Sequence, residues 1–121
     1  MQYMALIYAD EAGWDTLTDE QRQDMRGRYG ALADAAQKAG VMAGGDELAA
    51  TRDATTVRVR ADETLVTDGP YAELKEALGG YFLFECASME EAVDWAARIP
   101  AAEHGAVEVR PVFVDPEEPQ L

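Results

Sequence analysis

Hydrophobic positions along this chain recur with two spacings, one typical of strands and one typical of helices. Residues 2–8 (QYMALIY) are apolar on both alternating sets, which is typical of a strand covered on both faces. Residues 81–86 (YFLFEC) form the most hydrophobic stretch of the chain. Residues 106–114 place Val107, Val109 and Phe113 on one side of a strand. All three stretches are therefore predicted to be strands.

Weaker strand patterns lie in the middle of the chain. Residues 41–48 contain Gly44-Gly45, a pair that predicts a bulge or a close approach of another backbone. Residues 55–60 (TTVRVR) alternate cleanly, and residues 65–67 return after a turn at Asp62-Glu63. This region is therefore predicted to hold one strand followed by a hairpin.

A long helix is predicted between the first two strands. Thr18 and Gln21 fit a capping box at its start, and Gly40 is a natural stop. Gly27 and Gly30 weaken a helix by about 1 kcal/mol each, and we expect them to allow close packing on a sheet. The predicted apolar stripe is Met25, Tyr29, Leu32, Ala33 and Ala36.

A second, shorter helix follows the most hydrophobic strand. Ser88 and Glu91 fit another capping box, and Pro100 ends the helix. Residues 10–15, which include Trp14, are predicted to be a polar loop. The apolar stripe predicted for the short helix is Met89, Val93, Ala96 and Ile99.

The order of these elements is strand, long helix, strand, hairpin, strand, short helix, strand. This order matches an α+β, ferredoxin-like plan with helices on one face of a largely antiparallel sheet. Residues 2–8 and 81–86 are nevertheless apolar on both faces, so the second face of the sheet also needs cover. A second copy of the chain would provide it, which predicts a homodimer with a dimeric α/β barrel.

Length and charge narrow the classes of function. The 121 residues predict one domain, residues 1–114, followed by an acidic tail, residues 115–121, that we expect to be mobile. There are 10 basic and 24 acidic residues, for a net charge of -14. This balance argues against direct binding of nucleic acid and against anionic membrane surfaces.

Residue counts also limit the chemistry. A single cysteine, Cys86, allows no intrachain disulfide, and with one histidine it leaves no plausible metal cluster. Cys86 is expected to be a small core residue. The chain contains no P-loop and no dinucleotide-binding glycine motif, so no cofactor is predicted. Its first residues lack a basic region and a long apolar run, which predicts a cytoplasmic protein.

The segment DGPYAELKEALGGY (residues 68–81) holds the first candidate site residues. Asp68 can cap a turn in Asp-Gly-Pro, or it can end a strand and act as a general base or polar anchor. Glu73 and Lys75 can face water on a surface turn, or they can converge with Asp68 on a ligand. Lys75 is one of only two lysines, and a cation here would suit an anionic or carbonyl-bearing ligand.

Other candidates lie outside that segment. His104 is the only histidine and could serve as an acid or base, although a surface position is the ordinary one for such a residue. Arg110 is expected to bind an anion or to pair with Glu85 or Glu108. The aromatic residues Tyr8, Tyr81 and Trp14 could line a pocket or belong to the core.

Residues 66–85 (VTDGPYAELKEALGGYFLFE) resemble the signature of the DGPF-domain family within the YCII-related superfamily. The similarity continues over residues 3–14, 55–60 and 90–112, so it spans nearly the whole chain except the tail. Two positions depart from the usual signature. Tyr71 stands where phenylalanine is usual, and Leu74 stands where threonine is frequent, which removes a hydroxyl from this segment.

This resemblance implies a ferredoxin-like fold and a dimeric α/β barrel, in agreement with the strand pattern. It supplies no reaction, because members of the family are largely uncharacterised. Some YCII-related relatives carry a His–Asp pair proposed to be catalytic, but His104 lies near the last strand rather than at the start of the chain. Other relatives are labelled as transcription-initiation proteins or are encoded beside or fused to extracytoplasmic-function sigma factors, which implies such a partner by resemblance alone.

Two functions therefore stay open on sequence. The first is a small-molecule-binding protein, with or without acid–base catalysis by Asp68 or His104, whose ligand is held by Lys75 or Arg110. The second is a non-catalytic regulatory or interaction module linked to a sigma factor. Side chains that converge on a cavity would favour the first, and a surface without such groups would favour the second.

Overall fold

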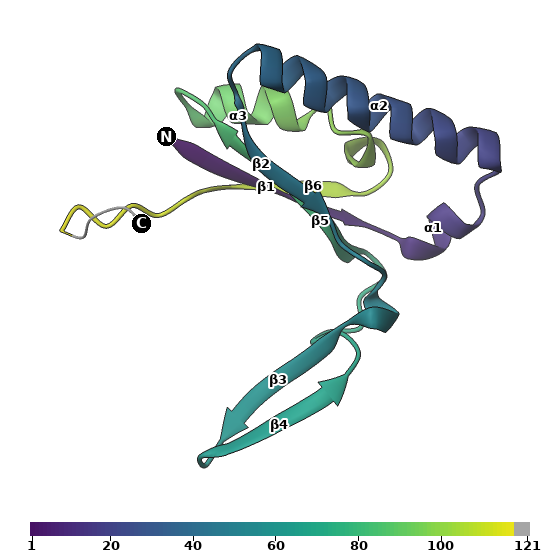
Figure 1. Ribbon diagram of the computed structural model, residues 1–121, viewed down its shortest axis with the longest axis vertical. Helices are drawn as coiled ribbons and strands as arrows, with labels where there is room; N and C mark the ends of the chain where they lie inside the picture. Colours follow the sequence, from purple (N-terminus) through teal and green to yellow (C-terminus); the bar gives the residue numbers. More distant parts are fainter. Residues whose placement is uncertain (118–121) are drawn as a thin grey trace.

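The computed structural model describes residues 1–117 and shows a mixed α+β chain with two antiparallel sheets (Figure 1). The larger sheet is formed by β1 Gln2–Ala9, β2 Met42–Glu47, β5 Ala77–Glu85 and β6 Ala106–Pro111. The smaller sheet is the hairpin of β3 Thr55–Arg60 and β4 Glu63–Asp68. The helices are α1 Glu11–Asp15, α2 Asp19–Lys38 and α3 Met89–Ala96, with the 3₁₀ helices η1 Thr51–Asp53 and η2 Pro100–Glu103.

The four strands of the larger sheet lie in the order β2-β5-β1-β6, and every neighbouring pair is antiparallel. Helix α2 follows β1, helix α3 follows β5, and both lie on the same side of the sheet (Figure 1). This order and layering are compatible with the predicted ferredoxin-like plan. The expected α+β class is therefore confirmed.

The core lies between the sheet and the helices α2 and α3. In β1, Tyr3, Ala5 and Ile7 point toward the helices and are buried. A row of aromatic rings crosses this layer: Tyr29 of α2 stacks on Phe82 of β5, Phe82 stacks on Phe84, and Trp95 of α3 lies tilted against Phe84. Burial of such rings supplies a large share of the apolar surface that a small domain removes from water. Leu32, Ala36, Ala92, Ala96 and Ile99 complete the helical side of the core.

Helix starts follow the predicted capping residues. The Thr18 hydroxyl accepts the Gln21 N–H at 3.1 Å, and the Gln21 side chain accepts the Thr18 N–H at 2.9 Å, which confirms the full capping box of α2. At α3 the Ser88 hydroxyl accepts the Glu91 N–H. The Glu91 carboxylate, however, accepts the N–H of Ala87 rather than that of Ser88, so the second box is only half formed.

Three helical predictions were wrong. Residues 11–15 form α1 rather than a loop, because Asp10 accepts the N–H of Ala12 and caps a short helix. Met89 and Val93 are exposed, and α3 instead buries the small residues Ala92 and Ala96, which let it approach the sheet closely. Gly27 and Gly30 lie on the exposed side of α2, where a Cβ atom would meet nothing within 4 Å, so they serve no close packing.

The glycine pair in β2 behaves as predicted. The pairing of β2 with β5 shifts in register between Met42 and Gly44, which is the expected bulge. A Cβ atom on Gly45 would lie 2.8 Å from the Tyr81 carbonyl oxygen, so the two backbones approach too closely for any side chain. The weak strand prediction at residues 41–48 is thus confirmed in its main feature.

The hairpin projects away from the larger sheet, as Figure 1 shows at the lower end of the molecule. Its turn lies one residue earlier than predicted, at Ala61 and Asp62, whose φ angles are 49° and 65°. Two consecutive positive φ angles match the turn that follows the natural twist of a two-residue hairpin. We refer to residues 55–68 as the arm.

The end of the chain leaves the sheet early. Strand β6 stops at Pro111, before the predicted end at residue 114, and Phe113 is exposed. Of the tail predicted to be mobile, residues 115–117 are described, and the Asp115 carboxylate accepts the N–H of Glu117. Residues 118–121 lie outside the described residues.

Candidate functional site

One face of the larger sheet is covered by helices, and the other is bare. Met4, Leu6 and Tyr8 alternate with the buried residues of β1 and therefore point to the bare face. The residues paired with them on β5 and β6 share this face, because opposite residues of antiparallel strands project to the same side. We call this surface the open sheet face, and its members are Met4, Leu6, Tyr8, Asp46, Leu78, Tyr81, Leu83, Glu108 and Arg110.

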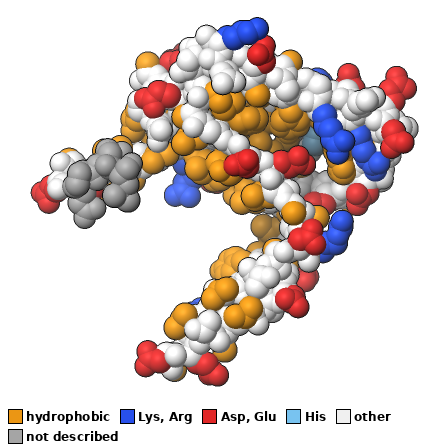
Figure 2. Space-filling view, in the orientation of Figure 1, with side chains coloured by type: hydrophobic (Ala, Val, Ile, Leu, Met, Phe, Trp, Pro, Cys, Tyr) orange, Lys and Arg blue, Asp and Glu red, His pale blue; other side chains and the backbone are white. Residues whose placement is uncertain are grey.

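The register arranges these residues in three rows. One row runs from Arg110 through Met4 to Leu83 and ends at Gly44. The next runs from Glu108 through Leu6 and Tyr81 to Asp46, and the last from Ala106 through Tyr8 to Leu78. Apolar and aromatic side chains thus occupy the two central strands, and the charged residues stand on the edge strands. Figure 2 shows hydrophobic side chains gathered beneath the sheet, toward the arm.

The polar groups of the open sheet face differ in their partners. The Tyr81 hydroxyl lies 3.4 Å from Asp46 Oδ2, to which it donates a hydrogen bond. Arg110 is exposed, and within residues 1–117 it forms no ion pair. The predicted pairing of Arg110 with Glu85 was wrong, because Glu85 binds the N-terminal amine at 2.6 Å instead. The predicted pairing with Glu108 is not formed either. Arg110 therefore keeps its donors available beside an apolar surface.

The predicted site residues fall into separate groups. Tyr8, Tyr81 and Arg110 share the open sheet face. Glu73 and Lys75 lie exposed in the irregular segment 69–76. That segment leads directly into Ala77, which pairs with Ala9, so it reaches the end of the sheet where Tyr8 lies. Asp68 is the last residue of β4 and pairs with Thr55 at the base of the arm.

His104 lies on the helical side of the molecule. It is exposed and follows η2, whose Glu103 pairs with Arg28 of α2. The Arg28 guanidinium lowers the pKa of the Glu103 carboxyl through this hydrogen bond, and the pKa of Arg28 is raised in turn. Among the described residues no hydrogen bond or ion pair joins His104 to Asp68, so the two predicted acid–base groups are not brought together in one chain.

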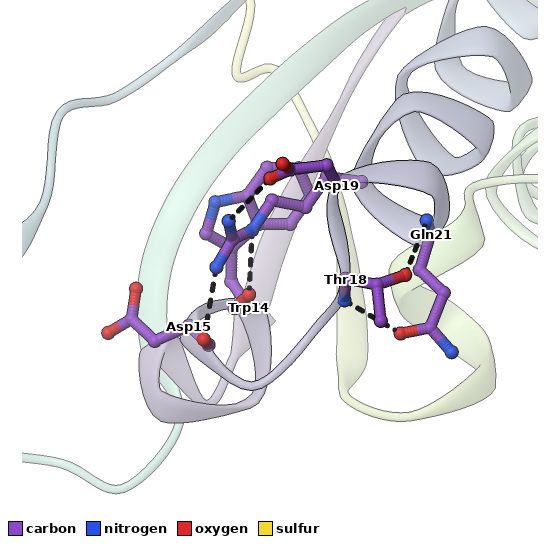
Figure 3. A network of polar contacts seen from close by, with 6 residues as sticks. Trp14, Asp15, Thr18, Asp19 and Gln21 are labelled. Carbon is purple, nitrogen blue, oxygen red and sulfur yellow. Dashed lines mark hydrogen bonds and ion pairs between the residues drawn. The ribbon is translucent and has the colours of Figure 1, made fainter.

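Trp14 is also away from the open sheet face. The guanidinium groups of Arg22 and Arg26 lie 5.8 Å and 5.3 Å from the centroid of its ring. Figure 3 shows the contacts that fix this corner, in which the Arg22 side chain donates to the carbonyls of Trp14 and Asp15 and pairs with Asp19. All the partners of Arg22 are thus local, which gives it a structural role at the start of α2.

Burial perturbs two groups in the core. The pKa of the Tyr29 hydroxyl is raised, mainly because the group is removed from water. The pKa of the Cys86 thiol is also raised, first by burial and then by the nearby carboxylates of Glu91 and Glu85. Cys86 is therefore a neutral core thiol at neutral pH, as predicted, and has none of the thiolate character of a nucleophile.

Two charged residues of the open sheet face were not among the candidate site residues predicted from the sequence. Asp46 faces Tyr81 across β2 and β5, and Glu108 faces Leu6 across β6 and β1. Alternation along residues 106–114 already placed Glu108 and Arg110 on one side of a strand. The bulge in β2 hides the same signal for Asp46, because it interrupts the alternation.

Metal-binding clusters and membrane-spanning helices are two further features that could indicate a function. Within residues 1–117, no group of three or more histidine, cysteine and acidic side chains is placed to hold a metal ion. In that same part of the chain, no helix is both long enough and apolar enough to span a membrane.

The fold and the candidate site define an α+β protein whose antiparallel sheet has one helix-covered face and one bare apolar face. The sequence model of the YCII-related domain matches residues 1–115, and the chain belongs to that family. An uncharacterized protein of Rhizobium meliloti (strain 1021) is 37% identical over 114 residues, which are 93% of this chain and 92% of the relative. The relative thus aligns with almost the entire fold, including the arm.

Proposed function

We propose that this protein is a homodimer that binds a small anionic or carbonyl-bearing molecule between two open sheet faces. The observation that carries the proposal is the apolar open sheet face, which helices do not cover. Two such faces packed against each other would form the dimeric α/β barrel expected from the sequence. Ligand sites in proteins are typically apolar clefts with a few placed polar groups, and the stacked faces would supply both.

Arg110 is the proposed anchor of the ligand. It is the one cation of the open sheet face, and it has no carboxylate partner among the described residues. A guanidinium presents a planar fork of donors that fits a carboxylate or a carbonyl oxygen. Its neighbour Met4, and Leu83 beyond Met4 in the same row, would exclude water, which strengthens such an interaction.

The two tyrosines are proposed to position the ligand. Tyr81 is held by its hydrogen bond to Asp46, so its ring has a defined direction on the face. Tyr8 lies in the next row, near the end of the sheet reached by the segment that carries Glu73 and Lys75. Lys75 is a second candidate cation at that end. The acid–base role of Asp68 and His104 stays a prediction, since neither residue belongs to the open sheet face.

Binding can be tested with benzoate, which joins a carboxylate to an apolar ring. We expect benzoate to shift the amide NMR signals of β1, β5 and β6 near Met4, Tyr81 and Arg110. Arg110→Gln should weaken benzoate binding by about tenfold, because it removes the charge that faces the carboxylate. The matched control is Arg98→Gln, which changes an exposed arginine beside the Trp95 ring on the helical side.

Two results would overturn the binding proposal. One is a set of benzoate-induced shifts confined to the helical side, around Trp14 or His104. The other is equal benzoate affinity in wild type and Arg110→Gln, which would exclude Arg110 as the anchor.

A further inference from the structure

The arm carries an apolar face that nothing in the described chain covers. Strands β3 and β4 pair only with each other. Val57 and Val66 are opposite each other and lie on one face of the hairpin, together with Val59. The exposed fractions of Val57, Val66 and Val59 are 60%, 64% and 59%, which is far more than isolated valines of a folded sheet normally show. We call this surface the valine face.

The chain itself contacts part of the opposite face of the arm. The Arg58 guanidinium lies 5.2 Å from the centre of the Tyr71 ring, which belongs to the segment after β4. The Thr56 hydroxyl donates to the carbonyl of Gly69 at 2.8 Å, and so fixes that segment against the hairpin. The chain therefore partly covers Thr56 and Arg58 on one side of its own arm and leaves the valine face bare.

The base of the arm is fixed to the body. The Glu11 carboxylate of α1 accepts the N–H of Thr51 in η1, at 3.2 Å. The Gly69 N–H donates to the carbonyl of Ala54 at 2.7 Å and extends the pairing of the two strands at the base of the arm. The first bond ties the entry of the arm to the body, and the second closes the arm itself. A two-stranded hairpin is at best marginally stable in water, and its bare face therefore needs an external partner.

The size of a stable interface favours a second copy as that partner. Taking strands of about six residues, the open sheet face has a planar area of ~390 Å², and the arm adds ~200 Å². Stable interfaces bury about 800 Å² on each partner. These flat areas are smaller than the accessible surface they carry, but their ratio shows that the arm enlarges the surface available to a second copy by about half. Figure 2 shows that hydrophobic side chains lie both beneath the sheet and along the arm, on the two sides of one hollow.

Symmetry also favours a second copy. Arg58 and Arg60 alternate with the valines of β3 and project to the opposite face of the arm, so the valine face presents no cation of this strand and suits an apolar partner surface. In a two-fold dimer both arms are covered at once, and no bare valine face remains.

We propose that the arm of each protomer docks its valine face on the second copy, so that the two arms clasp the dimer. This proposal rests on the dimer proposed above and adds a second, separable contact to it. The arm would then add to the affinity between the two copies. It would also fix how the two copies align, which the stacked sheets alone do not do.

Acidic substitutions on the valine face test the clasp. Val57→Asp and Val66→Asp should each weaken the dimer by at least about tenfold in sedimentation velocity, because they bury a carboxylate in an apolar contact. The control is Val93→Asp, which adds the same charge at an exposed valine of α3 and should leave the dimer as in wild type. Unchanged dimer affinity in both arm variants would overturn the proposal. Circular dichroism of each variant verifies that it is folded.

A crosslink identifies what the arm contacts. With p-benzoylphenylalanine in place of Val59, irradiation should join two copies of the chain into a covalent dimer. The proposal would be overturned if all crosslinks formed within one chain. It would also be overturned if, in the presence of a cell lysate, crosslinks formed only to a different protein.

A sheet variant separates this proposal from the stacking of the open sheet faces. Leu83→Asp should also dissociate the dimer. If Leu83→Asp dissociates the dimer and the arm variants have no effect, the proposed docking of the arm is overturned, and the stacking of the open sheet faces is supported. Dissociation by the arm variants alone would support the clasp and overturn the stacking of the sheets.

Discussion

Gly45 and Gly27 show how the same residue type has opposite roles at two positions. A Cβ atom at Gly45 would meet the Tyr81 carbonyl oxygen at 2.8 Å and the Phe82 ring at 2.9 Å. We expect Gly45→Ala to lower the free energy of unfolding by about 1–3 kcal/mol, because the backbone contact cannot yield without strain. Urea denaturation measures this change, and stability equal to that of wild type would show that the two strands can separate freely.

The matched substitution in α2 should have the opposite sign. A Cβ atom at Gly27 meets nothing within 4 Å, and the position is helical. Gly27→Ala is therefore expected to raise the free energy of unfolding by about 0.5–1 kcal/mol, since alanine loses less conformational entropy in a helix. The same urea experiment applies, and a destabilised Gly27→Ala variant would mean that α2 packs against something at this position.

Cys86 is expected to lower the stability of the fold as the pH becomes alkaline. Burial raises the pKa of its thiol in the folded chain above the unfolded value, which is about 8.5. The neutral thiol then stabilises the fold fully below that value, and this contribution is lost as the pH rises through the folded pKa. Between about pH 8 and pH 10, wild type should lose more stability than Cys86→Ala in urea denaturation. If the free energies of unfolding of wild type and Cys86→Ala changed equally with pH, the effect of burial on the thiol would be contradicted.

At the residue scale, the sequence predicts which chemical groups are present better than it predicts which partners their side chains meet. Alternation placed Arg110 on one side of the last strand, and glycine spacing located the bulge at Gly44-Gly45. The sequence could not show that Glu85 pairs with the N-terminal amine, because 84 positions separate the two groups along the chain. Arg110 therefore lacks the partner that local reasoning assigned to it.

Among the elements, α2 depends on a cap that both sequence and structure contain. Thr18→Ala removes the acceptor for the Gln21 N–H and should cost about 1 kcal/mol of stability. Thr18→Ser keeps the hydroxyl and should stay within a few tenths of a kcal/mol of wild type. Thermal denaturation compares the two variants, and equal losses in both would indicate that the methyl group of Thr18, not its cap, stabilises the helix.

Elements were predictable where local signals agreed with packing. The strands β1 and β3 follow their hydrophobic patterns closely, whereas β5 begins at Ala77, four residues before the predicted stretch 81–86. Helix α3 was located correctly but with the wrong buried face, because close contact with the sheet favours alanine over the larger Met89 and Val93. Helix α1 was missed, since a five-residue helix has too few positions to show a period.

At the scale of the whole molecule, one face of the larger sheet lacks cover, as the sequence already suggested. The bare side of β1 and β5 matches the two-sided hydrophobicity of residues 2–8 and 81–86. What the sequence could not supply is the register that assembles Tyr8, Tyr81 and Arg110 on one face and separates them from His104. It also could not reveal that the arm projects with a bare valine face, because alternation in β3 does not indicate what covers each side.

The central claim is that the open sheet face packs on a second copy of the chain. Sedimentation equilibrium of the wild-type protein at micromolar concentration tests it most directly. We expect a mass twice that of one chain for wild type, and the mass of a single folded chain for Leu83→Asp. A single-chain mass for wild type throughout the micromolar range would contradict the claim and leave the open sheet face without its proposed partner.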